Sequence, residues 1–86
     1  MNKNFGWALD QLRSGARVQR TGWNGRGMWL VLVNDWSFGG AAAEAFNAEP
    51  LPQVSSFIGM KTTDNKFVPW LASQTDVLAT DWQVAE

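Results

Sequence analysis

Two arginines, a tryptophan and several glycines are concentrated in one short segment, residues 20–28. Guanidinium groups such as those of Arg20 and Arg26 bind phosphate oxygens in a bidentate manner. The indole of Trp23 offers a face for stacking on a base, and the glycines let a ligand approach the backbone N–H groups closely. The segment also fits a tight hairpin that holds a structural tryptophan, because its glycine spacing matches neither a phosphate loop nor a dinucleotide fingerprint. Its candidate ligand-binding residues are Arg20, Trp23, Asn24, Arg26 and Met28.

A second segment, residues 70–76, combines one aromatic residue with a run of small polar side chains. Hydroxyl, amide and carboxyl groups can donate hydrogen bonds to, or accept them from, a ribose or a base edge. The alternative is that Thr75 or Asp76 caps one helical turn, whereas Ser73 and Gln74 are harder to explain as caps. The candidate ligand-binding residues here are Trp70, Ser73, Gln74, Thr75 and Asp76.

The charge balance favours a small ligand over a nucleic acid. The chain has seven Lys and Arg against eight Asp and Glu, which gives a formal net charge of −1. Binding to duplex DNA usually needs a basic face that neutralises many phosphates, so DNA and RNA are not expected partners. A small anionic ligand needs two or three cations, and Lys61 could supply one beside the arginines, although a solvated surface lysine is the more common outcome.

Several classes of catalytic site are excluded by composition. The chain has no histidine and no cysteine, so it cannot build a Ser-His-Asp triad, an imidazole-ligated metal site or a thiolate site. Its carboxylates show no spacing that forces a catalytic pair or a hard-cation cluster. We therefore expect a binding protein without cofactor or metal, and not an enzyme.

The length predicts one domain, over residues 1–86, with a thin core. Chains of this size often gain stability by self-association. Each of the six tryptophans buries about 150–250 Å², and so small a core can hardly enclose them all. Trp82 is expected in the core, whereas Trp7 points off the apolar stripe of its expected helix. We expect the surplus rings at contacts between copies of the chain or over a planar ligand.

The periodicity predicts an α+β fold with a short N-terminal helix and an antiparallel sheet of about five strands. The helix spans residues 5–14, with Asn4 as N-cap and Gly15 as C-terminal stop. Residues 35–52 are an irregular, variable insertion in which 41–46 could form a short helix. The expected strands cover residues 16–20, 28–34, 54–61, 67–71 and 81–85.

Turn signals connect these strands. Asn24-Gly25 is a strong hairpin signal, and residues 63–66 form a second turn. Pro69 indicates an edge strand or a bulge. The strand over 28–34 is apolar on both faces, so we expect it to be covered on both sides, one of them by a neighbouring copy of the chain.

No targeting or membrane segment is predicted. The N-terminus lacks the apolar region of a signal peptide, and the longest apolar run, residues 28–33, is far shorter than the roughly 20 residues of a membrane helix. We expect a cytoplasmic protein without a membrane partner.

The motifs resemble a known family of small phage-encoded proteins, the second type of Thoeris anti-defence protein. The start of the pattern is carried by the apolar positions of residues 5–18, by Arg20, and by the Gly22-Trp23-Asn24-Gly25 and Gly27-Met28 motifs. The end is carried by Met60-Lys61, by the run Val68-Pro69-Trp70-Leu71-Ala72-Ser73-Gln74-Thr75-Asp76, and by Leu78-Ala79 and Asp81-Trp82. The resemblance covers nearly the whole chain except residues 35–52.

This resemblance implies a sponge protein, meaning one that sequesters a signal without cleaving it. Members form homotetramers and bind glycocyclic ADP-ribose, the signal of a TIR-domain defence enzyme, in the cytoplasm of the infected bacterium. Some also bind cyclic dinucleotides at a separate site. Our hypothesis for this chain is that Trp23 and Trp70 stack on the ligand and that the polar residues of the two segments recognise ribose and base. Arg20, Arg26 or Lys61 then binds the phosphate.

Two other functions fit the same residues. The chain could be a structural phage protein whose tryptophans serve assembly alone, or an inhibitor that docks on a host defence protein. The insertion over residues 35–52 departs from the family pattern and could shape specificity.

Overall fold

The N-terminal helix α1 spans Phe5–Arg13 and begins where the sequence predicts. In this computed structural model, which describes residues 3–23, 27–34, 44–45 and 52–86, the side chain of Asn4 accepts a hydrogen bond of 2.9 Å from the backbone N–H of Trp7. This cap satisfies one of the helix's unpaired N–H groups. The helix ends at Arg13 with Ser14 as its C-cap, and Gly15 follows with a φ of +93°, the left-handed conformation that favours glycine after a helix.

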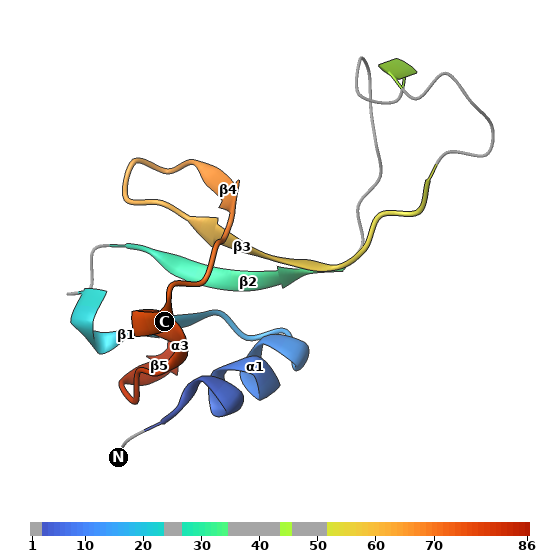
Figure 1. Ribbon diagram of the computed structural model, residues 1–86. Coiled ribbons are helices and arrows are strands. Elements are labelled where there is room, and N and C mark those ends of the chain that lie inside the picture. Colours follow the sequence, from blue (N-terminus) through green and yellow to red (C-terminus); the bar gives the residue numbers. More distant parts are fainter. Residues whose placement is uncertain (1–2, 24–26, 35–43, 46–51) are drawn as a thin grey trace.

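Five antiparallel strands form one sheet, and the predicted α+β class is confirmed. The spatial order of the strands is β4-β3-β2-β1-β5, so β4 and β5 are its edges. Figure 1 shows α1 beside β1 and β5 at one end of the fold, with the β3–β4 hairpin at the other. The strands are β1 (Val18–Arg20), β2 (Trp29–Val33), β3 (Phe57–Lys61), β4 (Phe67–Pro69) and β5 (Trp82–Val84). A 3-10 turn at Thr21–Trp23 follows β1, and the four-residue helix α3 (Gln74–Val77) precedes β5.

The core lies between α1 and the centre of the sheet. Val18 of β1 pairs with Leu30 of β2 on one side and with Val84 of β5 on the other. Ala8 and Leu12 of α1 are buried against this layer. The largest core side chain is Trp82, which is 2% exposed, so its predicted place in the core is confirmed.

All five predicted strands are longer than the observed ones, and for β3 the reason is that a strand ends where its partner ends. The strand predicted over 54–61 begins at Phe57, since Phe57 pairs with Val33, the last residue of β2. The strand predicted over 16–20 begins at Val18. The strand predicted over 67–71 ends at Pro69, after which Trp70 donates one more hydrogen bond to Ile58.

Within the single chain, only one face of β2 is covered, whereas its apolar sequence predicts cover on both faces. Leu30 is fully buried, whereas the other four residues of β2 are half-buried. Successive residues of a strand point to opposite faces, and α1 covers the face of Leu30. The prediction that a second copy covers the other face stays a prediction.

The β3–β4 hairpin confirms the turn predicted over residues 63–66 and the edge-strand position predicted for Pro69. Its turn includes Asn65, which has a φ of 64°, a conformation that asparagine tolerates. Pro69 lies in the edge strand β4, where the missing N–H group does not interrupt a central ladder.

The Asn24-Gly25 turn and most of residues 35–52 lie outside the described residues, and Glu44 and Ala45 of the possible helix over 41–46 are helical. Among the described residues, no helix is long and apolar enough to cross a membrane.

Candidate functional site

Arg20 joins the two segments that the sequence singled out. It lies at the end of β1, next to Trp82 in the register of β5. Its Nη1 donates to the Oδ1 of Asp76 at 2.8 Å, and its Nε donates to the Oδ1 of Asp81 at 2.8 Å. The side chain of Arg20 is 18% exposed. The two hydrogen bonds, with Asp81 contributing most, raise the pKa of Arg20, so the group is a permanent cation held between two carboxylates.

Asp81 holds the turn after β1 in place. Its Oδ2 accepts a hydrogen bond of 2.8 Å from the N–H of Gly22, and its backbone carbonyl accepts one of 2.9 Å from the N–H of Thr21. The hydrogen bond from Arg20 lowers the pKa of Asp81. The carboxyl group therefore stays ionised and fixes the backbone of the glycine-rich segment instead of exchanging protons.

Ser73 is the N-cap of α3, which corrects the prediction that Thr75 or Asp76 caps this turn. The Oγ of Ser73 accepts a hydrogen bond of 3.1 Å from the N–H of Asp76 and donates one of 2.9 Å to its Oδ2. Spacing of three residues between the hydroxyl and the carboxylate permits this reciprocal contact. Asp76 is thus not the cap itself but the residue that joins the cap to Arg20.

Four aromatic rings gather beneath these polar contacts, and we call Phe5, Trp23, Trp70 and Trp82 the Trp82 cluster. Trp23 and Trp70 meet Trp82 edge-on, with ring centroids 5.5 and 6.1 Å away. The indole N–H of Trp82 donates to the backbone carbonyl of Asp76 at 3.1 Å. Edge-to-face pairs of this kind are worth about 0.5–1.5 kcal/mol beyond their burial. Trp23 and Trp70 remain half-buried, so part of each indole is accessible.

The remaining candidates divide between three places. Gln74 and Thr75 are exposed on α3, next to Asp76. Lys61 is the register partner of Trp29, and both lie on the face of the sheet opposite to Leu30, which we call the far face. The Nζ of Lys61 donates a hydrogen bond of 2.9 Å to the carbonyl of Gly27. Met28 is half-buried and directly precedes β2. Asn24 and Arg26 lie outside the described residues.

The far face of the sheet carries a polar hollow of about 480 Å³ that the sequence did not reveal. Gln19 and Gln83 are register partners in β1 and β5 and line it together with Trp29 and Lys61. Arg17 lies 5.1 Å from the ring of Trp29. Only the pairing of four strands brings these residues together, and no local motif marks them.

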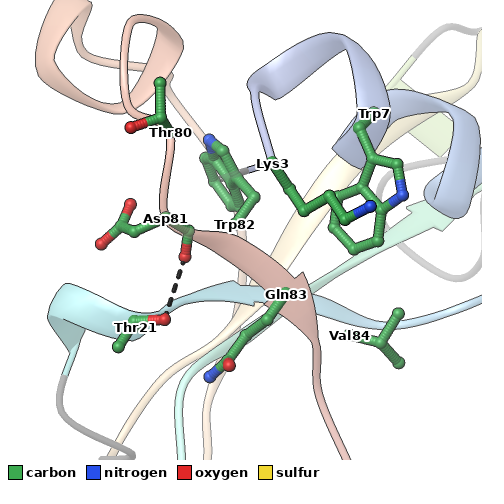
Figure 2. A pocket seen from close by; sticks show the side chains of 8 residues that line it. All are labelled: Lys3, Trp7, Thr21, Thr80, Asp81, Trp82, Gln83 and Val84. Carbon is green, nitrogen blue, oxygen red and sulfur yellow. Dashed lines mark hydrogen bonds between the residues drawn. The ribbon is translucent and has the colours of Figure 1, made fainter. Parts of the chain in front are cut away.

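A second hollow, of about 300 Å³, lies along β5 (Figure 2). Trp7 and Lys3 form one wall, and the ammonium of Lys3 lies 5.5 Å from the centroid of the indole. Figure 2 shows Thr21 and Asp81 on the other side of the strand, joined by a hydrogen bond. Trp7 packs against the buried core, and its half-buried ring also lines this hollow.

The arrangement is suited to binding by stacking and hydrogen bonding. Among the described residues, no group of three acidic side chains could hold a metal ion. The two carboxylates that fold together, those of Asp76 and Asp81, share one arginine. The accessible groups beside them are indole faces, hydroxyls and an amide, which recognise planar polar ligands.

Comparison with known proteins agrees with the motifs. The family model of the Thoeris anti-defense 2-like domain matches residues 3–85. A curated protein of Bacillus phage SP01, named Thoeris anti-defense 2, is 42% identical over 87 residues, which cover 94% of this chain and 92% of that protein.

Proposed function

The chain belongs to the Thoeris anti-defense 2-like family, and on that premise we propose that it protects a phage by binding and sequestering a nucleotide-derived immune signal without cleaving it. The proposed ligand is glycocyclic ADP-ribose, and cyclic dinucleotides are a second ligand class for a separate site. The proposed place of action is the cytoplasm of the infected bacterium. Sequestration keeps the signal from the effector that it would activate.

One observation carries this proposal: the two ligand-binding segments predicted from sequence lie together in the fold. Residues 20–23 and 70–76 are about fifty positions apart, yet Arg20 pairs with Asp76 and both Trp23 and Trp70 contact Trp82. Two loops that carry half-buried indoles and polar side chains at one end of a sheet form a platform suited to one planar ligand.

The geometry favours distinct roles within this platform. The exposed parts of Trp23 and Trp70 are proposed to stack on bases, and Gln74 and Thr75 to recognise ribose or base edges. The Nε and Nη1 of Arg20 are paired with carboxylates, so we assign Arg20 to positioning the two loops. Lys61 lies on the opposite face of the sheet, so the proposed cation for the phosphate is Arg26.

The affinity that a sponge needs is within reach of these contacts. Depletion of a micromolar signal needs nanomolar binding, about −12 kcal/mol. Stacking supplies about 1–3 kcal/mol per base, and each charge-assisted hydrogen bond about 1.5–3 kcal/mol. Such values need a pocket that excludes water, and we propose that a homo-oligomer, a tetramer in the family pattern, provides this enclosure.

Titration calorimetry with glycocyclic ADP-ribose and a panel of cyclic dinucleotides tests the proposal. We expect submicromolar binding of at least one ligand by the natural chain. Trp23→Ala and Trp70→Ala should abolish binding of glycocyclic ADP-ribose, whereas Trp29→Ala, a half-buried tryptophan on the other face of the sheet, should retain it. Absence of binding to every ligand by an intact oligomer would favour a structural role and overturn the proposal.

A further inference from the structure

Among the described residues, the ion pairs that join the two loops leave one nitrogen of the Arg20 guanidinium, Nη2, without a partner. Nε donates to Asp81 and Nη1 donates to Asp76, each at 2.8 Å. The same part of the chain contains no buried side-chain nitrogen or oxygen that lacks a hydrogen bond. Because Nη2 has no such bond, it is accessible, although the whole side chain is only 18% exposed.

Both neighbouring carboxylates are fixed by further hydrogen bonds, so the guanidinium is held in one orientation. Besides its bond from Arg20, Asp81 accepts one of 2.8 Å from the N–H of Gly22 with its Oδ2. Asp76 likewise accepts one of 2.9 Å from the hydroxyl of Ser73 with its Oδ2. A donor whose supporting groups are themselves held in place loses little freedom when a ligand binds. The N–H groups of Nη2 are therefore preorganised for an acceptor on a ligand.

Gly22 leaves room beside this donor. A Cβ atom at position 22 would lie 3.6 Å from the Nη2 of Arg20 and 3.1 Å from the Oδ2 of Asp81. The φ of Gly22 lies outside the left-handed region, so the backbone conformation does not require a glycine here. The absent side chain instead keeps one side of Nη2 open, and the next residue is Trp23, whose half-buried indole is part of the proposed platform.

The charge of this group decides which kind of acceptor it suits. One guanidinium and two ionised carboxylates give the group a formal charge of −1. A phosphate at Nη2 would therefore meet two like charges at short range, which disfavours its binding there. A ring nitrogen or a ribose hydroxyl accepts the same hydrogen bond without that repulsion.

We propose that the Nη2 of Arg20 recognises a neutral acceptor atom on the adenosine part of the bound nucleotide, and that Gly22 keeps this donor accessible. Arg20 then determines specificity in addition to positioning the two loops, and the phosphates of the ligand bind elsewhere. This inference rests on the proposed function, because it names the chemistry that one part of the platform recognises.

The first test uses the natural chain and so needs no variant that could misfold. In nuclear magnetic resonance, the nitrogen and proton resonances of Nη2 report on hydrogen bonding at that atom. Saturating glycocyclic ADP-ribose should shift these resonances of Arg20. The same resonances of Arg13, whose side chain is 69% exposed on α1, should stay in place. Inorganic phosphate alone should leave the Nη2 of Arg20 unchanged.

Ligand analogues identify the acceptor. The 1-deaza, 3-deaza and 7-deaza forms of glycocyclic ADP-ribose each replace one adenine ring nitrogen by C–H, and a deoxy form lacks the free hydroxyl of the adenosine ribose. One of these analogues should bind at least about tenfold more weakly in calorimetry, as expected for the loss of a hydrogen bond to a charged group.

Gly22→Ala shows whether that loss depends on Nη2. Because the added Cβ atom covers one side of the donor, the difference between the parent ligand and the weakened analogue should shrink to about twofold or less. Gly6→Ala is the matched control, at an exposed glycine of α1 where a Cβ atom would lie 3.4 Å from its nearest neighbour. It should keep the tenfold difference, and melting temperatures check that both variants fold.

The outcomes separate this inference from the proposed function. Ligand binding that leaves the Nη2 resonances unchanged, or equal affinities for the parent and all analogues, would overturn the role of Arg20 and leave the sponge function standing. A shift of Nη2 by inorganic phosphate alone would overturn the neutral acceptor. A natural chain that binds no form of the ligand would overturn both the inference and the proposed function.

Discussion

Arg20 and Asp76 form an ion pair of 2.8 Å across 56 positions of the chain, with both side chains mostly buried. Asp81 pairs with the same guanidinium at 2.8 Å. This one arginine therefore connects the glycine-rich turn, the cap of α3 and the start of β5. The relation explains how two loops with little regular structure acquire a fixed mutual position.

Replacing Arg20 should destabilise the protein and separate the two loops. Arg20→Met keeps most of the side-chain volume but leaves two carboxylates near each other without a cation. We expect a loss of about 1.5–3 kcal/mol in the free energy of unfolding, the range for a hydrogen bond to a charged group. Urea titration measures the loss. Arg13→Met, at an exposed arginine that lies 3.7 Å from Asp10, serves as control and should cost less than about 0.5 kcal/mol.

The depressed pKa of Asp81 predicts a loss of stability in acid. A carboxyl group whose pKa is lower in the folded state stabilises the fold above its unfolded pKa of about 3.9. That contribution disappears as the pH falls through the lower folded pKa. Melting temperatures between pH 7 and pH 2 should therefore fall less steeply for Asp81→Asn than for the natural chain. Parallel curves for the two proteins would show that Arg20 does not stabilise the ionised form.

The sequence predicted the fold class and the elements with local signals. Asn4, Gly15 and Pro69 act through their own backbone geometry, and their predicted roles as helix cap, helix stop and edge-strand residue agree with the structure. Strand ends were predicted less well, because the end of β2 determines where β3 begins. The ends of a strand depend on the length of its partner strand, and no local sequence signal indicates them.

The assignment of Ser73 as the N-cap of α3 can be tested by comparing the stability effects of substitutions at Ser73 and at Thr75. Ser73→Ala removes the acceptor for the N–H of Asp76 and should cost about 0.5–2 kcal/mol. Thr75→Ala changes an exposed residue whose hydroxyl makes no hydrogen bond within the described structure, and it should change stability by less than about 0.5 kcal/mol. Thermal melts of the two variants check this order. A larger loss for Thr75→Ala would contradict the assignment of Ser73 as the cap.

Gly59 lies directly under the ring of Phe67 in the β3–β4 hairpin. A Cβ atom at position 59 would come within 2.2 Å of that ring, so Gly59→Ala must displace Phe67. Because Phe67 is half exposed and its ring can move, we expect a cost of about 1 kcal/mol, at the low end for overpacking. In a Phe67→Ala background the same change should cost almost nothing. A double-mutant cycle measured by urea unfolding gives both values, and equal costs in the two backgrounds would exclude this contact as the cause.

The candidate site could be predicted only in part. The motifs indicated both loops, and the fold brings Arg20, Trp23, Trp70 and Asp76 together. The role of Asp81 was missed because it depends on its position beside Gly22 across two strands. The place of Lys61 on the opposite face depends on the register of β3, which a single sequence does not reveal.

The central claim is that the protein holds a nucleotide-derived signal and leaves it intact. A filtration assay tests this directly: glycocyclic ADP-ribose is incubated with excess protein, the filtrate is analysed by chromatography, and the retained protein is then heat-denatured. The account predicts that the ligand is missing from the filtrate and returns chemically unchanged after denaturation. Ligand that stays in the filtrate, or that returns cleaved, would contradict it.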